Sequence, residues 1–565
     1  MRDLTMGAPG LSRAKSVADG FSDAVLADAS PRLLAGLVLL ALAASAGLAL
    51  MPTYPIGAQL NDFFLLVDWI HRWGAGQVPH RDYHAPLGFL ATAPAALGFA
   101  FTGDVGRALR LADIAALAAL TGPFLVAARG RLSNGLATIA FAVVAALTLT
   151  PLDLFNLLPF PSAAMTYNRV GWAALLVAAL FLVPARRPAE RPTSALDLAM
   201  LAWLALLGLY LKATYGLALG AIGLLYLALH RPPARALLPA VVLALGGIGL
   251  IEAVFGLNRA YLVDLAFAAG VDGAGRMGPA RVLFALTASG GDVLLGALVP
   301  VAVALAAGRR ALAAAIAVLL ALAVAVMLQN AQASGLPLLV AGAVIAAAVV
   351  DRAGWGRPAR LLALALPLAA AAPTLELALR TWDGTARALA KPGALTGTAL
   401  PGLRTLRVPG EPGFALVARA AAGGLDARTY VAEAARLAPT GAQNYRLADA
   451  LAMLAAARDL VPACRLGGGS ALMLDFADPL PAVAGLAPAG RMPVLHAWRS
   501  FSAARHPAAD AVLAGVDCVL VPLLPLEASS TDLALALYGE AIRLRFPDRV
   551  ETPFFTLYRR GAQRG

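Results

Sequence analysis

The sequence predicts an all-α polytopic membrane domain of about eleven transmembrane helices plus interfacial helices, followed by an extramembrane α/β domain. Of its 565 residues, 60% are hydrophobic and only 14% are charged, whereas soluble domains are nearer half apolar and a quarter charged. Apolar runs of about 20 residues, long enough to cross a bilayer, recur along the first two-thirds of the chain. Richness in Ala and Leu favours helices over the alternating strands of outer-membrane barrels.

The chain begins with a polar segment, residues 1–31, that we interpret as a cytoplasmic tail. Its charged lead-in is too long for a cleaved signal peptide. The membrane domain follows as residues 32–375, with a large first outer loop at 52–106. The predicted spans are residues 32–51, 107–127, 134–150, 170–184, 195–211, 216–230, 236–256, 284–307, 311–328, 335–350 and 360–375.

Arginine positions predict the orientation of these spans. If the N-terminus is inside, each of five inner loops holds at least two arginines, which is the positive-inside pattern. We therefore expect a multi-pass protein of a bacterial inner membrane, with its C-terminal domain in the periplasm. The net charge of +12 lies largely on such arginines and indicates no nucleic-acid partner. The inner-loop arginines are Arg129, Arg131, Arg186, Arg187, Arg191, Arg231, Arg235, Arg309, Arg310, Arg352, Arg357 and Arg360.

Residues 86–103 form a further apolar segment, which contains two prolines and ends at a glycine. If this segment crossed the membrane, every later loop would change sides and the arginine pattern would reverse. We therefore expect it to lie in, or dip into, the outer interface.

The C-terminal segment, residues 376–565, is predicted to be an outer domain of mixed α/β structure. Residues 517–525 form an apolar run that ends in proline, as expected of a buried strand. Residues 531–546 have the pattern of an amphipathic helix with Thr531 as its N-cap, and residues 554–560 predict a final strand. The only cysteines, Cys464 and Cys518, lie in this domain. An oxidising compartment permits a disulfide between them, and two separate buried thiols are the alternative.

The first outer loop gathers unusual polar chemistry between residues 61 and 90, including three of the chain's six histidines. Helical periodicity places Asp62 on the side of an aromatic stripe, where it either caps the helix or faces the membrane domain. Asp68 and Arg72 are four residues apart, which favours a surface ion pair. Asp82 lies between His80 and His84 in a loop, where it is either solvated or part of a metal site.

Three further polar clusters are predicted on the outer side. One precedes a span, the second is an isolated lysine between two spans, and the third ends a helix. Each has an ordinary alternative as an aromatic belt, a snorkelling lysine or a loop cap. The residues are Tyr167, Asn168 and Arg169 in the first, Lys212 in the second, and Gln329, Asn330 and Gln332 in the third.

Parts of the chain resemble the GT-C membrane glycosyltransferases, which include protein O-mannosyltransferases and bacterial transferases that modify lipid A or cell-wall glycans. The resemblance lies in an acidic residue after the first span, a short helix, and the segment GQVPHRDYHAPLG at 76–88. Gly103, Arg107, Arg110 and Leu111 at the next span, together with Leu211–Lys212, are similar to further family elements. This family often has Asp-Glu where the chain has Asn61-Asp62.

The resemblance implies transfer of a sugar from a polyprenyl-phosphate donor, within membrane lipids, to an extracytoplasmic lipid, glycan or protein. An inverting transfer needs a carboxylate base for the acceptor hydroxyl and cations for the phosphate leaving group. We expect Asp62 to be the base and Asp82 a supporting acid or a ligand of a divalent ion, Mg or Mn. The expected substrate-binding residues are Lys212, Arg169, Asn168, Tyr167, His84, Arg81, Gln329 and Asn330.

Two other classes of function fit the composition. A secondary transporter would place ionisable residues within its spans, and here only Glu252 and Asp113 approach that description. A non-catalytic membrane assembly protein would need none of these polar residues for activity. The sequence has no P-loop, no GxSxG and no HExxH motif, so it does not support an ATPase, a serine hydrolase or a zinc protease.

Overall fold

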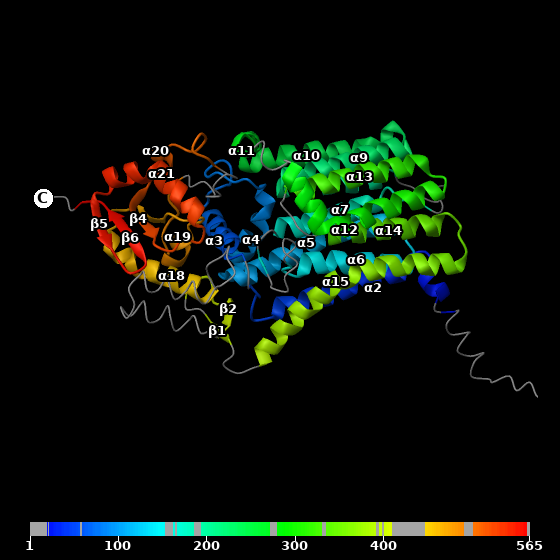
Figure 1. The fold of residues 1–565 in the computed structure, drawn as a ribbon, viewed down its shortest axis with the longest axis horizontal. Helices are drawn as coiled ribbons and strands as arrows, with labels where there is room; N and C mark the ends of the chain where they lie inside the picture. Colours follow the sequence, from blue (N-terminus) through cyan, green and yellow to red (C-terminus); the bar gives the residue numbers. More distant parts are fainter. Residues whose placement is uncertain are drawn as a thin grey trace, which may run out of the picture.

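The computed structural model describes residues 20, 22–56, 59–152, 162–163, 166–185, 194–271, 279–329, 335–390, 395–397, 400–409, 447–490 and 501–561. These residues form a bundle of long helices with a small α/β domain at one end (Figure 1).

The described residues include a helix for each of the eleven predicted spans. Within this part of the chain, seven helices are long and apolar enough to cross a membrane, namely α2, α5, α8, α9, α10 with its preceding turn, α13 and α15. The described chain is thus largely helical and of the multi-pass membrane type. The helices are α2 Pro31–Leu50, α5 Val105–Ala128, α6 Asn134–Leu149, α7 Thr166–Leu180, α8 Ser194–Leu211, α9 Ala213–His230, α10 Leu238–Phe255, α12 Pro279–Ala306, α13 Arg310–Gln329, α14 Leu336–Arg352 and α15 Arg357–Ala390.

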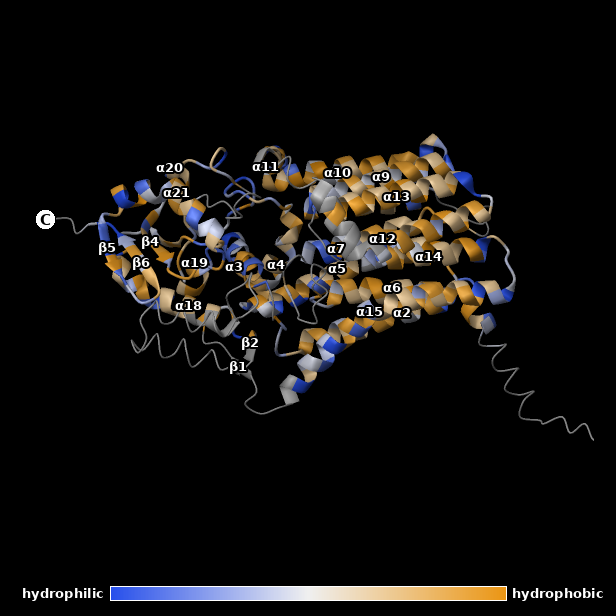
Figure 2. Ribbon diagram, viewed as in Figure 1, coloured by the Kyte–Doolittle hydropathy of each residue, from blue (hydrophilic) through white to orange (hydrophobic). Residues whose placement is uncertain are grey.

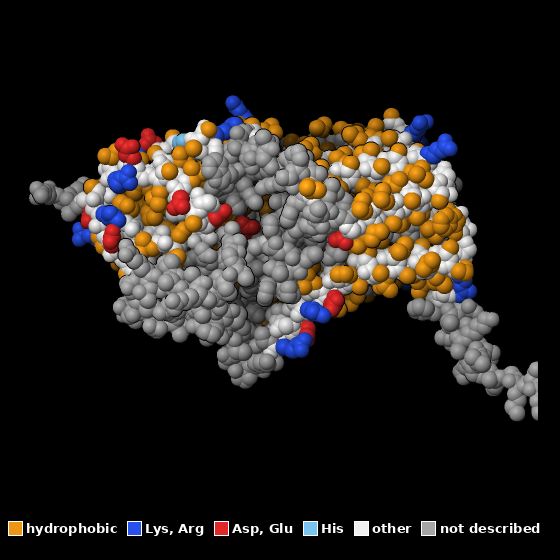
Figure 3. Space-filling view, viewed as in Figure 1, with side chains coloured by type: hydrophobic (Ala, Val, Ile, Leu, Met, Phe, Trp, Pro, Cys, Tyr) orange, Lys and Arg blue, Asp and Glu red, His pale blue; other side chains and the backbone are white. Residues whose placement is uncertain are grey.

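Hydrophobic residues predominate in the bundle helices (Figure 2), and hydrophobic side chains cover much of the bundle face shown in Figure 3. Leu50, Leu217 and Leu362, from three different helices, are each more than 70% exposed. An apolar exterior on this scale suits lipid and not water. Inside the bundle, α12 and α14 approach closely, since a Cβ on Gly342 would lie 2.1 Å from the carbonyl oxygen of Gly296. Small residues at such contacts are typical of helices packed in membranes.

Basic residues gather at the end of the bundle opposite the α/β domain, where Figure 3 shows Lys and Arg side chains. Arg131 pairs with Asp197 at 2.5 Å, and Arg360 donates to Asp351 at 2.6 Å. Several of the inner-loop arginines therefore also hold helices together by buried or partly buried ion pairs. The arginines predicted in the loop around residues 186–191 lie outside the described residues.

The last bundle helix is longer than predicted. The span was expected to end at residue 375, but α15 continues to Ala390. Pro373 lies inside the helix and does not end it. Beyond it, Glu376 pairs with Arg380 at 2.5 Å and Asp383 pairs with Arg387. These pairs, each four residues apart, support an exposed helix where the sequence indicated only a rise in charge.

The first outer loop contains the helices α3 Leu60–Gly74 and α4 Ala93–Thr102, with a 3₁₀ turn at Phe89–Ala91 between them. With ten residues, α4 is about 15 Å long, half of what a bilayer core requires. Its Gly98 packs directly on the backbone of Ala108 in α5. The placement of residues 86–103 in the outer interface stays a prediction. A helix that was not predicted, α11 Asn258–Val271, follows α10 at the end of the bundle that faces the α/β domain.

The α/β domain is built on a four-stranded sheet with strand order β3-β4-β6-β5, and among these described strands only β3 and β4 are parallel neighbours. A separate two-stranded sheet pairs β1 Leu395–Gly397 with β2 Arg407–Pro409. The main sheet consists of β3 Ser470–Met473, β4 Val516–Pro522, β5 Asp548–Glu551 and β6 Phe555–Arg559. The helices described here are α18 Leu447–Leu460, α19 Leu480–Ala484, α20 Ala509–Val512 and α21 Ala528–Arg545, with a 3₁₀ turn at Val461–Cys464.

The predicted strands 517–525 and 554–560 correspond to β4 and β6, and the predicted helix 531–546 corresponds to α21. The predicted N-cap was wrong, because α21 begins three residues earlier, after Glu527. The Thr531 hydroxyl instead donates to Asp475 at 3.2 Å. Of the two alternatives for the cysteines, the structure has the disulfide Cys464–Cys518, with the Cα atoms 5.6 Å apart.

Helix α3 joins the α/β domain to the bundle. Phe63 and Phe64 of α3 are buried in one hydrophobic core together with Phe476 and Phe555 of the α/β domain. On the polar side, the His71 ring nitrogen Nε2 lies 2.7 Å from the Leu486 carbonyl oxygen. The first outer loop is therefore held between the two parts of the molecule.

Candidate active site

The predicted polar clusters meet at the end of the bundle that faces the α/β domain. Gln59 precedes α3 in a left-handed conformation with φ +54°, and its side-chain oxygen accepts a hydrogen bond from the Ser162 hydroxyl at 2.8 Å. Ser162 lies four residues before α7 begins. This contact ties the start of α3, where half-buried Asp62 occupies the first turn, to the segment that leads into Tyr167.

Lys212 lies between α8 and α9, at the N-cap position of α9. Its ammonium nitrogen is 5.0 Å from the centre of the Tyr167 ring, which is a cation–π contact. The end of the first outer loop reaches the same place, because the Gly88 amide donates to the Leu211 carbonyl at 3.2 Å. The structure thus brings together two predicted substrate-binding residues and the loop that carries the family-like segment.

Two predicted amide residues lie close by. The Tyr215 hydroxyl donates to the Asn168 side-chain oxygen at 3.2 Å, and Asn168 is buried. The Thr214 hydroxyl lies 3.5 Å from the Gln329 side-chain oxygen, so the end of α13 meets the start of α9. Asn330 lies outside the described residues.

The prediction that Arg169 contacts a phosphate requires an accessible guanidinium, and the structure does not provide one. It is fully buried, donates to the Leu147 carbonyl at 3.3 Å, and lies 3.4 Å from the Asp113 carboxylate. Tyr54 donates to the same carboxylate at 3.0 Å. Residues two apart on a helix point in nearly opposite directions, so Arg169 points into the bundle while Tyr167 meets Lys212. The position of Arg169 is that of an internal structural ion pair.

Asp82 and Arg81 pair with each other at 2.8 Å. The Asp82 carboxylate also accepts from the Val78 amide at 2.7 Å, and the Arg81 guanidinium lies 3.4 Å from the Phe255 carbonyl at the end of α10. Asp82 therefore closes the turn between Val78 and Tyr83.

The two histidines instead share a carboxylate from α11 that was not predicted. The Nδ1 atom of His84 lies 2.6 Å from Asp264 and that of His80 lies 2.9 Å from it, while the Ala85 amide donates to the same carboxylate at 3.0 Å. Burial alone would raise the pKa of Asp264, but these hydrogen bonds outweigh it and hold the pKa below its ordinary value. The sequence does contain a signal for this site: Asp264 lies within the apolar run YLVDLAF, and a carboxylate in such a run requires polar partners.

A metal site built from His80, Asp82 and His84, which the sequence left as an alternative, is not supported by this arrangement. Both imidazoles use Nδ1 for Asp264, and Asp82 bonds within its own turn. In the part of the chain that the structure describes, no group of three or more His, Cys, Asp or Glu side chains is arranged to hold a metal ion.

Asp68 and Arg72 do form the predicted pair, at 2.9 Å, but the expectation that it lies on the surface was wrong. The two side chains are 7% and 1% exposed, because residues 486–490 of the α/β domain cover them. Arg72 donates to the Gly490 carbonyl at 3.2 Å. Burial raises the pKa of Asp68 although Arg72 opposes the shift. Burial and the neighbouring Asp68 charge raise the pKa of Asp478 well above its ordinary value.

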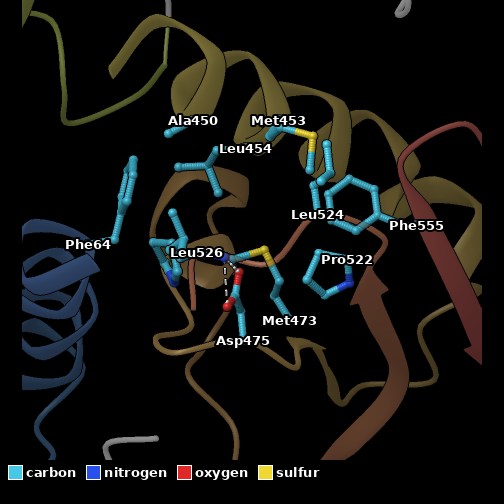
Figure 4. Close-up of a pocket in the computed structure, with 11 residues that line it drawn as sticks. Phe64, Ala450, Met453, Leu454, Met473, Asp475, Pro522, Leu524, Leu526 and Phe555 are labelled. Atoms are coloured by element: carbon cyan, nitrogen blue, oxygen red, sulfur yellow. Dashed lines mark hydrogen bonds between the residues drawn. The ribbon is translucent and has the colours of Figure 1, made fainter. Parts of the chain in front are cut away.

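The described residues also line two apolar pockets, one in the bundle and one in the α/β domain. One lies between α7, α13 and α14, and its described lining is apolar and includes Trp172, Ala323 and Ala341. The other lies in the α/β domain against α3 and is lined by Phe64, Met453 and others (Figure 4).

In the second pocket, Figure 4 shows Asp475 in the wall, where it accepts from the Leu526 amide at 2.8 Å. Burial raises the pKa of Asp475 to about 7, although hydrogen bonds from the backbone and Thr531 oppose the shift. The carboxylate holds the loop before α21 in place, so we interpret this pocket as part of the domain core.

Comparison of the chain with protein-family models, with curated proteins and with solved structures finds no match in any of the three.

Proposed function

We propose that this protein is a membrane glycosyltransferase of the GT-C type, which transfers a sugar from a polyprenyl-phosphate donor to an acceptor outside the cytoplasm. In this proposal all eleven bundle helices cross the membrane, the N-terminus is cytoplasmic, and the α/β domain is periplasmic. The arginines at the opposite end of the bundle support this orientation.

One observation carries the proposal: Lys212 contacts Tyr167 of α7, and the same helix lines the apolar pocket between α7, α13 and α14, here called the slot. Tyr167, which contacts Lys212, is five residues before Trp172 in the slot wall, about 8 Å along α7. Gln329 is six residues beyond Ala323 of the same wall, about 9 Å along α13. Pro337, at the start of α14, also lines the slot.

This arrangement suits a lipid phosphate. A polyprenyl chain would occupy the apolar slot between α13 and α14, and its phosphate would meet the Lys212 ammonium at the membrane surface. The ammonium would stabilise the negative charge that the phosphate gains as the sugar departs. Tyr167 holds the lysine side chain in place by the cation–π contact.

The base of the reaction is Asp62 in this proposal. Its carboxylate would take the proton of the acceptor hydroxyl while the oxygen attacks the anomeric carbon and the bond to the lipid phosphate breaks. The helix N-terminus favours the charged form of a carboxylate in the first turn. The contact between Gln59 and Ser162 keeps this turn beside the entrance to α7. Gln329 offers an amide group for a sugar hydroxyl, and no step requires the buried Arg169 or Asn168.

The test uses purified protein in lipid nanodiscs with a panel of polyprenyl-phosphate-linked sugars, and measures transfer or hydrolysis of the sugar. We expect Lys212→Ala to weaken donor binding about 10- to 100-fold, the loss of one charged hydrogen bond. Asp62→Asn should lower turnover about 10²- to 10⁴-fold with little change in donor binding.

A second pair of variants tests the slot. Ala341→Phe fills it, whereas Val318→Phe adds the same ring at a lipid-facing position on α13 that is 46% exposed. Donor binding should fall only in Ala341→Phe. Equal binding by all variants, or turnover by none of the proteins with any donor, would contradict the proposal and favour a transporter or an assembly protein.

A further inference from the structure

An unassigned cluster lies where three segments of the chain meet: the first outer loop, α11 and a loop of the α/β domain. The His84 ring stacks on Phe267 with the centres 5.6 Å apart and an interplanar angle of 17°. The guanidinium carbon of Arg505 lies 5.1 Å from the centre of the same ring. One aromatic side chain therefore contacts two groups that can carry positive charge.

Asp264 determines how His84 can act. Because its Nδ1 atom bonds the carboxylate at 2.6 Å, only the Nε2 edge can meet a ligand, and the side chain is 29% exposed. When the ring carries both protons, its Nε2–H lies on the edge away from the carboxylate. An imidazolium held in this way donates Nε2–H to an anion.

His80 provides an independent sign that this region is built to hold a polar group. Its side chain is fully buried, its Nδ1 atom bonds Asp264 at 2.9 Å, and its ring packs on Tyr261 at 4.5 Å. The Nε2 atom of His80 is buried and has no hydrogen-bond partner among the described residues. A buried nitrogen of this kind is costly unless a water or a ligand satisfies it.

The charges around the cluster favour an anion. Asp264 is engaged with two imidazoles, and Asp82 on the same loop is paired with Arg81. Arg505 is exposed and forms no ion pair with any described residue. Arginine presents a planar set of donors that matches phosphate and carboxylate oxygens.

We propose that His84 and Arg505, mounted on Phe267 and oriented by Asp264, form a binding site for an anionic group of the acceptor, a phosphate or a carboxylate. The acceptor role rests on the proposed function, whereas the anion site stands on its own geometry. In this arrangement the α/β domain contributes Arg505 directly to substrate recognition, and the first outer loop contributes His84.

The test measures anion binding without any turnover. The full chain, labelled with ¹³C at histidine Cε1, is placed in nanodiscs of phosphatidylcholine and titrated with inorganic phosphate or acetate at constant ionic strength. The resonance missing in His84→Gln identifies His84. We expect its resonance to shift on adding phosphate.

Two arginine variants separate the site from general electrostatics. Arg505→Ala should weaken phosphate binding at least tenfold, roughly the loss of one charged hydrogen bond. Arg458→Ala removes an arginine on α18 of the same domain that pairs with Asp459, and should leave binding unchanged. A second arm uses nanodiscs of phosphatidylglycerol without phosphate, to test a lipid headgroup as the source of the anion.

Each outcome decides the proposal. No shift of the His84 resonance in phosphate or acetate overturns it, as does a shift that is equal in Arg505→Ala. A shift in phosphatidylglycerol alone, with no further effect of phosphate, assigns the site to a membrane lipid and overturns the acceptor role. Sugar transfer without anion binding refutes only this site, whereas anion binding without transfer from any donor refutes only the proposed function.

Discussion

Replacing Arg72 by alanine should loosen the α/β domain from the first outer loop. Arg72 is fully buried, where it bonds Asp68 at 2.9 Å, the Gln77 side chain at 3.0 Å and the Gly490 carbonyl at 3.2 Å. Its guanidinium also lies 5.3 Å from the centre of the Tyr83 ring. Without Arg72, the two buried carboxyl groups of Asp68 and Asp478 would lose the guanidinium charge that compensates them.

The expected loss of stability follows from this burial. Removing one partner of a buried ion pair typically costs about 3–5 kcal/mol, because the other charge is left uncompensated. For a domain of 150–250 residues each kcal/mol shifts the melting temperature by about 2–4 °C. We therefore expect Arg72→Ala to lower the melting temperature of the outer domain by roughly 6–20 °C.

The assay is thermal unfolding in nanodiscs, monitored by limited proteolysis of the α/β domain. Arg458→Ala is the matched control, since its ion pair with Asp459 is partly exposed and such pairs contribute about 0–1 kcal/mol. The double variant Asp68→Asn/Arg72→Met should recover part of the loss. A melting temperature for Arg72→Ala equal to that of Arg458→Ala would refute the reasoning.

Three further predictions concern other contacts. The pKa of Asp475 is raised to about 7 in the folded domain, whereas the pKa of an aspartate in the unfolded chain is near 3.9. Between about pH 4 and about pH 7 the folded state therefore binds one more proton than the unfolded state, and stability should fall as the pH rises through this range. Asp475→Asn should flatten this part of the stability curve, which is measured by thermal unfolding. The disulfide Cys464–Cys518, with a sequence separation of 54, should contribute about 2–5 kcal/mol to the free energy of unfolding. Cys518→Ser should therefore lower the melting temperature, and the unreduced wild type should take up no thiol label when denatured. Gly88→Ala should displace the first outer loop from Lys212, because the added Cβ would lie 2.1 Å from the Tyr210 carbonyl oxygen, and donor binding should fall.

Each of these has its own control. A slope between pH 4 and 7 that is equal in wild type and Asp475→Asn would remove that carboxylate as its source. Thiol labelling of unreduced, denatured wild type would contradict the disulfide. Gly74→Ala is the counterpart of Gly88→Ala, since nothing lies within 4 Å of a Cβ at Gly74. If both glycine variants bind donor as wild type does, the close approach at Tyr210 does not matter for binding.

Much of the architecture was predictable because its signals are local. Hydropathy located a helix at each of the eleven predicted spans, and short patterns located β4, α21 and β6. Lys212 and Tyr167 were each chosen as outer polar residues, and the structure brings them into contact. Local patterns were misleading at the end of the last span. The rise in charge there predicted the end of the helix, but α15 continues beyond Glu376, with ion pairs along it.

The sequence by itself therefore determined the membrane class, the helical segments and the end of the bundle that carries the polar chemistry. Only the tertiary structure decided which charges meet. Asp264 pairs with His80 and His84 across about 180 residues, Arg169 is held by Asp113, and the α/β domain buries Asp68. The physical reason is that hydropathy and periodicity act between near neighbours, whereas a buried charge is compensated by whichever partner long-range packing places beside it.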